Sequence, residues 1–270
     1  MALRKPSWSL STKRIKLTVA YDGTDFRGWA AQAEQRTVQS TLKEAVRQVS
    51  GEDIEIIGAS RTDSGAHAKG QVCHFDSKVD IPPERWARIL NNVLASDVSV
   101  RNSCERKSNF HSRFSAEDRW YRYRIGITNR DALTARYVHD YGRDLALKPM
   151  QEAAGYLQGD HDFLAFTEEL DPSVNNTRRI LYSVEVRLVR DEVWVDVIGT
   201  AFLRGMMRRM AGALLEVGRG SRSIEEVSRL LTEERSRMQW PVVLPAKGLC
   251  LMRVKYGRHP IDNRTVSDDS

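Results

Sequence analysis

The most constraining feature of this sequence is a period-two alternation of apolar and polar side chains, which occurs once in each half of the chain. The apolar positions are Ile15, Leu17, Val19 and Tyr21 in the first half, and Tyr121, Tyr123, Ile125 and Ile127 in the second. Because successive residues of a strand point to opposite faces of a sheet, this pattern predicts two half-buried strands. Segments with the 3.6-residue apolar period of amphipathic helices follow each strand. The sequence therefore predicts an α+β fold.

The same reasoning along the whole chain predicts two halves with similar element content. Strands are expected at 15–21, 54–60, 71–76, 98–106, 119–127, 180–189, 193–198 and 249–256. Helices are expected from Thr37 to a stop at Gly51, from Pro82-Pro83 towards Leu94, and over 150–157, 202–217 and 224–231. We expect a basic disordered arm at 1–14, subdomains at 15–110 and 111–258, and a disordered tail at 259–270. A cleft between the subdomains is the natural place for a site.

The charge balance favours a polyanionic partner. The 270 residues include 42 Lys plus Arg against 36 Asp plus Glu, which gives a net charge of +6. In the predicted strand that starts at Arg119, cations alternate with aromatic rings, a mixture that suits RNA. The alternative is an edge strand with a solvated basic face. The residues concerned are Arg119, Arg122, Arg124 and Arg130, together with Trp120, Tyr121 and Tyr123.

Other features of the sequence argue against metal, disulfide and membrane chemistry. Cys73, Cys104 and Cys250 form no C-x-x-C pair, so neither a zinc site nor a disulfide framework is indicated, and a cytoplasmic location fits best. Asp160-His161-Asp162 would alternate between the two faces of a strand, which does not suit metal ligation. No apolar run approaches the ~20 residues of a membrane span. The basic first fourteen residues lack the apolar core of a secretory signal.

The stretch from Gly58 to Ala68 is the candidate catalytic segment. It places one carboxylate, Asp63, in a turn of small residues directly after an apolar strand. Gly65 would allow the backbone to turn, and Arg61 could pair with the carboxylate or with a phosphate. An ordinary Asp-Ser-Gly turn is the alternative interpretation.

A second pair of candidates lies on the predicted helix 202–217. Arg204 and Arg208 are four residues apart, so they would project from one side of that helix. A solvated helix face is the alternative. Gly205 and Gly212 would weaken the helix by about 1 kcal/mol each, which suggests that another backbone or a ligand approaches closely.

Taken together, seven motifs in one order resemble the TruA family of tRNA pseudouridine synthases over roughly residues 15–256. They are Tyr21-Asp22-Gly23-Thr24 with Gly28-Trp29, Thr37-Val38-Gln39, Arg61-Thr62-Asp63-Ser64-Gly65-Ala66-His67-Ala68, Gly70-Gln71-Val72, Arg113-Phe114-Ser115-Ala116 through Tyr121-Arg122-Tyr123, Gly159-Asp160-His161-Asp162-Phe163 and Phe202-Leu203-Arg204-Gly205-Met206-Met207-Arg208.

The resemblance implies two ferredoxin-like subdomains with mainly antiparallel sheets around a basic central cleft, and a homodimer. It also implies that uridines at positions 38, 39 and 40 of the tRNA anticodon stem-loop are isomerised without metal or cofactor. The resemblance makes Asp63 the catalytic nucleophile and gives Arg61 a part in extruding the target base. It places Tyr121 on that base, pairs Arg208 with the carboxylate, and puts Leu249 in the pocket lining. Arg204, Arg122 and Arg124 are our candidates for RNA-backbone contacts.

Departures from the family pattern leave the set of modified tRNAs open but remove no expected catalytic group. Ser60 replaces a usual glycine, and Leu94-Ala95 replaces a usual leucine-proline. Ala30, Gly205 and Arg209 also differ from the common residues. A non-catalytic RNA-binding or tRNA-chaperone protein on the same fold is the alternative function, and the presence of Asp63, Tyr121 and Arg208 argues against it.

Overall fold

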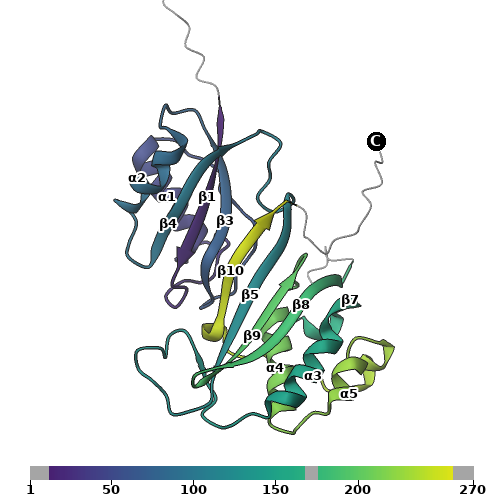
Figure 1. The fold of residues 1–270 in the computed structure, drawn as a ribbon. Helices are drawn as coiled ribbons and strands as arrows, with labels where there is room; N and C mark the ends of the chain where they lie inside the picture. The colour runs from purple at the N-terminus through teal and green to yellow at the C-terminus, as the bar shows by residue number, and fades with distance from the viewer. Residues whose placement is uncertain (1–11, 168–175, 258–270) are drawn as a thin grey trace, which may run out of the picture.

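One large sheet organises the molecule. The computed structural model describes residues 12–167 and 176–257, and within them ten strands form a single sheet. Its order is β4-β1-β3-β10-β5-β9-β8-β7, with β2 added to β3 and β6 added to β5 (Figure 1). The strands are β1 (Lys13–Tyr21), β2 (Ile57–Gly58), β3 (His67–Ser77), β4 (Val98–Arg106), β5 (Ala116–Gly126), β6 (His139–Asp140), β7 (Gly159–Asp162), β8 (Arg178–Val189), β9 (Glu192–Gly199) and β10 (Leu249–Tyr256).

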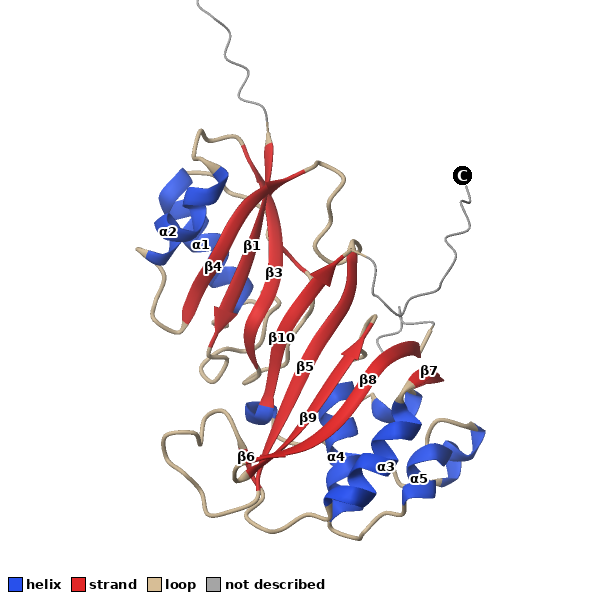
Figure 2. Cartoon of the chain, viewed as in Figure 1, coloured by secondary structure: helices blue, strands red, loops and turns tan. Residues whose placement is uncertain are grey.

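The helices lie in two groups, which confirms the α+β class. Helices α1 and α2 accompany the part of the sheet built from β4, β1 and β3, whereas α3, α4 and α5 accompany β9, β8 and β7 (Figure 2). The bounds are α1 (Val38–Ser50), α2 (Trp86–Asn91), α3 (Leu147–Leu157), α4 (Met206–Gly218) and α5 (Ile224–Arg229). Single 3₁₀ turns occupy Pro83–Arg85, Leu164–Phe166, Glu233–Arg237 and Ala246–Gly248.

Strand β10 joins the two halves of the sheet. It comes from the end of the described chain, yet it lies between β3 and β5 (yellow in Figure 1). It pairs antiparallel with β5 along most of its length, and parallel with β3 at only two positions, Cys250 opposite His67 and Leu251 opposite Ala68. Because His67 and Ala68 follow the Asp63 loop directly, β10 brings that loop next to the C-terminal half.

Where local signals were strong, the predicted boundaries are confirmed. Thr37 caps α1 in a capping box with Ser40, and Gly51 ends the helix with a left-handed φ of 73°. Strands β4 and β10 occupy the predicted ranges 98–106 and 249–256. The β8–β9 hairpin also forms as predicted, with Arg190 at a positive φ of 54° in its turn.

Other boundaries differ because contacts distant in sequence compete with the local pattern. The predicted strand 54–60 is reduced to the two residues of β2, since the carbonyl of Ile56 accepts a hydrogen bond from the Gln39 side chain at 2.6 Å. The predicted helix from Pro82-Pro83 towards Leu94 contains only a 3₁₀ turn and α2. Strand β1 begins at Lys13, inside the predicted arm; residues 1–11 and the predicted tail, from 259 on, lie outside the described residues.

Helix α4 begins at Met206 rather than at Phe202. Gly205 takes a left-handed φ of 71° at its N-cap, which interrupts the helical path before that residue. Arg204 therefore lies outside the helix, and the prediction that it shares a helix side with Arg208 is wrong. The close approach inferred from Gly212 is confirmed, because a Cβ added there would lie 2.0 Å from the carbonyl oxygen of Val242.

Candidate active site

The Asp63 loop is clamped between β3 and the segment that follows β1. Gly65 has a positive φ of 81°, as its place in the turn predicted, and its N–H donates to the carbonyl of Phe26 at 3.2 Å. The Thr62 carbonyl accepts from the N–H of Trp29 at 3.1 Å, and a Cβ on Gly28 would lie only 2.6 Å from that same oxygen. One backbone segment, residues 26–29, thus holds the loop on both sides of Asp63.

Asp63 faces the first turn of α4. The Nη1 of Arg208 donates to Oδ2 of Asp63 at 3.2 Å, across 145 residues of sequence. The Nε of Arg208 donates to the carbonyl of Leu244 at 2.6 Å, so its guanidinium is held at two points. The side chains of Arg208 and Asp63 remain 18% and 23% exposed, which leaves the carboxylate accessible from solvent.

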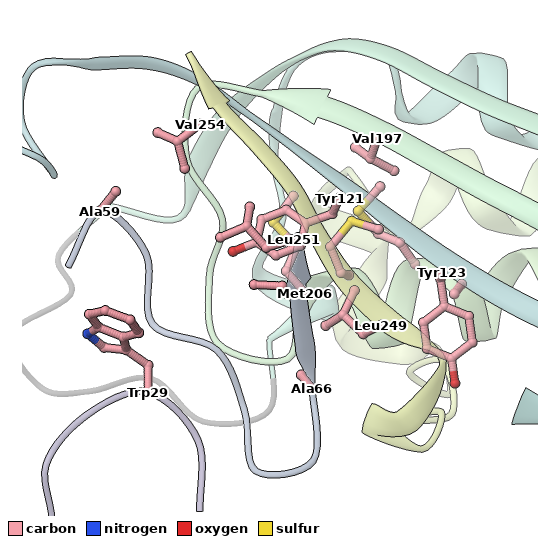
Figure 3. Packing of buried hydrophobic residues seen from close by; sticks show 14 of the residues in the cluster. Trp29, Ala59, Ala66, Tyr121, Tyr123, Val197, Met206, Leu249, Leu251 and Val254 are labelled. Atoms are coloured by element: carbon pink, nitrogen blue, oxygen red, sulfur yellow. The ribbon is translucent and has the colours of Figure 1, made fainter. Parts of the chain in front are cut away.

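Tyr121 lies beside this ion pair, in the middle of β5. The side chain is buried, its ring meets Phe202 edge-to-face at 4.8 Å between centroids, and its hydroxyl hydrogen-bonds the Ser60 hydroxyl at 2.7 Å. Burial raises the pKa of Tyr121 to about 12, so the phenol keeps its proton at neutral pH. Leu249, Leu251, Met206 and Tyr121 belong to one packed cluster of buried side chains (Figure 3).

Leu249 begins β10 opposite Tyr123 and is buried. The 3₁₀ turn that precedes it comes close to the Asp63 loop, because a Cβ on Gly65 would contact the Ala246 Cβ at 3.7 Å. The four segments that carry Asp63, Arg208, Tyr121 and Leu249 therefore meet in one region, as the sequence led us to expect.

The other predicted residues occupy different environments. Arg61 is exposed, and the described residues offer it no ion pair. Arg204 is also exposed and precedes α4. Arg122 donates to both oxygens of Asp196, at 2.8 and 3.0 Å, and stacks on Trp194 at 3.8 Å. Arg124 donates to both oxygens of Glu192 at 2.7 and 2.6 Å.

The alternative of an edge strand with a solvated basic face is wrong, because β5 lies between β10 and β9. No acidic residue lies between Arg122 and Arg124 in β5, but β9 supplies partners: Asp196 lies directly opposite Arg122, and Glu192 lies two residues from the position opposite Arg124. Their side chains are only 13% and 26% exposed. Sequence spacing within one strand could not show these partners, which depend on the register between β5 and β9.

Ser60 is a residue that sequence reasoning noted without assigning it a role. Its hydroxyl is the partner of Tyr121, and its carbonyl accepts from the Gln71 side chain at 2.7 Å. The only sequence signal was its difference from the usual glycine. Nothing in the residue type indicated that the partner would be a tyrosine 61 positions away.

The site combines an accessible carboxylate, a guanidinium that orients it and a buried aromatic ring with a protonated hydroxyl. This set suits nucleophilic or electrostatic catalysis at a sugar carbon with a base held against the ring. In the described part of the chain, no group of three His, Cys, Asp or Glu residues could hold a metal ion. No helix there is both long and apolar enough to cross a bilayer.

Comparison with known proteins identifies relatives with one activity. A family model described as tRNA pseudouridine synthase matches residues 17–115 and 153–257. Proteins named tRNA pseudouridine synthase A from Anoxybacillus flavithermus and Brevibacillus brevis are 39% and 40% identical over 245 residues, covering 90% of this chain and 99% and 100% of theirs. The protein of that name from Clostridium acetobutylicum is 40% identical over 247 residues, covering 90% of this chain and 100% of its own.

A solved structure titled "Crystal Structure of a Cbf5-Nop10-Gar1 Complex" aligns with 87% of this chain and 57% of its own. Its sequence is 9% identical to this chain, and the TM-score is 0.34.

Proposed function

Because the chain belongs to the tRNA pseudouridine synthase family, we propose that Asp63 is the residue on which its isomerisation of uridine to pseudouridine depends. The observation that carries this proposal is the ion pair between Asp63 and Arg208, with Tyr121 beside it. A non-catalytic RNA-binding role is not favoured, because the curated relatives are named as synthases and the three side chains are present together.

The reaction breaks the bond between N1 and C1′ and forms a bond between C5 and C1′. The proton on C5 is lost, and N1 gains one, so the product is an isomer and neither an oxidant nor an energy source is consumed. The site has to supply a carboxylate for the sugar or the base and a pocket that retains the detached uracil while it rotates. Asp63 and the Tyr121 ring have these properties.

Arg208 fixes the rotamer of Asp63, because its guanidinium is itself anchored on the Leu244 carbonyl. Tyr121 offers one aromatic face to the extruded base, a contact worth about 1–3 kcal/mol. Leu249 contributes apolar surface that helps to keep the site dry. Arg61, exposed and two residues before Asp63, helps to extrude the target base or holds a phosphate.

We infer uridines of the tRNA anticodon stem-loop as the substrates, from the likeness to proteins named tRNA pseudouridine synthase A. The two helix groups and the position of β10 between β3 and β5 support two ferredoxin-like subdomains, and we propose the basic cleft between them from the family resemblance. A homodimer follows from the same family resemblance. Cys73, Cys104 and Cys250 form no disulfide, which supports a cytoplasmic location.

A tritium-release assay with Asp63→Asn tests the proposed function. Uridine labelled at C5 loses its tritium when C5 bonds the sugar, so release from a tRNA transcript reports turnover. We expect the wild-type protein to release tritium and Asp63→Asn to release none, while its tRNA affinity stays within about tenfold because phosphate contacts dominate binding. Substantial turnover by Asp63→Asn, checked for deamidation, would falsify the assignment.

A further inference from the structure

Phe114 is the most exposed aromatic side chain among the described residues, with 77% of its surface accessible. It belongs to the loop between β4 and β5, which leads into the strand of Tyr121. One face of the ring stacks on His111, with 4.3 Å between centroids and 30° between planes. The Arg113 guanidinium lies 5.7 Å from the Phe114 centroid. The ring is therefore supported on one side and accessible on the rest of its surface.

The loop holds this ring rigidly. Nδ1 of His111 accepts the backbone N–H groups of Arg113 and Phe114, each at 3.2 Å. A nitrogen that accepts two such bonds carries no proton of its own. Burial, together with the nearby charges of Arg14 and Arg113, lowers the pKa of His111, so the imidazole behind Phe114 is neutral at pH 7.

The same loop is bonded to the strand that leads into the Asp63 loop. The Ser112 hydroxyl donates to the carbonyl of Ile57 at 2.7 Å. One nitrogen of the buried Arg119 side chain donates to the carbonyls of Arg113 at 2.7 Å and Ala59 at 3.3 Å. Ser60, which follows Ala59, is the hydrogen-bond partner of Tyr121. The position of Phe114 is thus fixed relative to the candidate active site through a short chain of hydrogen bonds.

The surroundings of the ring favour a negatively charged ligand. Arg113, Arg106 and Lys107 are exposed. A groove of about 580 Å³ adjoins the loop, and Glu105 is the only acidic group among its lining residues. Those residues are Glu105, Arg106, Lys107, Asn109, Phe110 and Ser115. An accessible aromatic face among basic side chains is the combination that single-stranded RNA binds, with its bases on the ring and its phosphates on the cations.

We propose that Phe114, backed by His111, is a stacking platform for an unpaired nucleobase of the tRNA that is bound at the Asp63 loop. The inference rests on the proposed function, because it takes its ligand from the tRNA substrate. The platform binds a base outside the catalytic pocket and takes no part in the chemical step. It should therefore contribute to affinity and leave the rate of the bound complex unchanged.

Measurements of tRNA affinity and single-turnover rate test this inference. We expect Phe114→Ala to weaken tRNA binding by about five- to 150-fold, the range for loss of one base–aromatic stack, and Phe114→Trp to bind within about threefold of wild type. Phe114→Leu keeps an apolar side chain against His111 but removes the aromatic face, so it should also bind weakly. The matched control is Tyr156→Ala, which removes a half-exposed aromatic ring from α3 and should leave affinity unchanged.

Three readouts separate this inference from its rivals. At saturating enzyme, Phe114→Ala should form pseudouridine within about threefold of the wild-type rate. Its affinity should fall with salt as steeply as that of wild type, because a neutral ring releases no counterions. The proposal would be overturned if Phe114→Ala and Phe114→Leu bound tRNA with wild-type affinity. It would also be overturned if these variants were monomers where the wild type is a dimer, since the ring would then bind a second copy of the chain. Wild-type protein without synthase activity would contradict the proposed function instead.

Discussion

At the scale of single residues, the candidate site depends on two contacts that link distant parts of the chain. Arg208 and Tyr121 both reach the loop of Asp63, but through different atoms: one binds the carboxylate and the other binds Ser60. The first contact was predicted from a resemblance, because the motif that contains Arg208 is distinctive. The second could not be predicted, since a serine in place of glycine carries no information about its partner.

Arg208 and its neighbour Arg209 form a matched pair for testing the first contact. Each donates to one backbone carbonyl at 2.6 Å, Arg208 to Leu244 and Arg209 to Pro241. Only Arg208 also reaches Asp63, because one residue along a helix turns the side chain by about 100°. We expect Arg208→Met to lower the single-turnover rate by about 10- to 150-fold, the loss of one charge-assisted hydrogen bond, and Arg209→Met to stay within about threefold. A crippled Arg209→Met beside an active Arg208→Met would contradict this assignment.

The hydroxyl and the ring of Tyr121 can be tested separately. Tyr121→Phe loses only the contact with Ser60, whereas Tyr121→Ala also loses the stacking face, so the alanine variant should be slower by about five- to 150-fold in single turnover. Ser60→Ala and the double variant Ser60→Ala with Tyr121→Phe complete a double-mutant cycle. We expect a coupling free energy of about 0.5–1.5 kcal/mol between the Ser60 and Tyr121 hydroxyls. Equal rates for the Phe and Ala variants would show that stacking is not the role of the ring.

At the scale of elements, the sequence predicted best the boundaries that depend on neighbouring residues. Helix α1 has its capping threonine and its terminal glycine within the local sequence. In contrast, β2 is short because a side chain of α1 donates to the carbonyl of Ile56, the residue before β2, and α4 starts late because Gly205 turns the backbone first. These outcomes depend on tertiary contacts and on the choice of backbone conformation at a single glycine, which periodicity does not record.

Two helical glycines give opposite predictions for stability. Gly212 in α4 packs against the backbone of residue 242, where an added Cβ would lie 2.0 Å from the carbonyl oxygen. Gly212→Ala should therefore destabilise the fold by about 1–3 kcal/mol or more and slow turnover, because the segment that includes Val242 and Leu244 also anchors Arg208. Gly155 in α3 is exposed with open space around it, so Gly155→Ala should stabilise by about 0.5–1 kcal/mol. Urea unfolding measures both, and a neutral Gly212→Ala would show that α4 is not packed this closely.

At the scale of the whole molecule, net charge and the arrangement of charges lead to different expectations. The excess of 42 basic over 36 acidic residues indicates affinity for RNA that falls steeply with salt. It does not indicate which arginines contact phosphate. Arg122 and Arg124, which the sequence pattern places on an exposed face of their strand, form ion pairs within the sheet. Only the register between the strands therefore separates arginines that stabilise the fold from those that are available to a ligand.

Arg122 and Arg61 test this distinction. Asp196 is almost fully buried and accepts hydrogen bonds from Arg122, Arg187 and Trp120, so Arg122→Ala removes one of three partners from a desolvated carboxylate. We expect a loss of about 1–3 kcal/mol in unfolding free energy, with no change in the slope of log affinity against log salt concentration. Arg61→Ala, which breaks no ion pair in the described residues, should leave stability unchanged and reduce that slope by about one unit if it holds a phosphate. A reduced slope for Arg122→Ala at unchanged stability would mean that Arg122 leaves Asp196 to bind RNA, and the β5 face would then be part of the tRNA site after all.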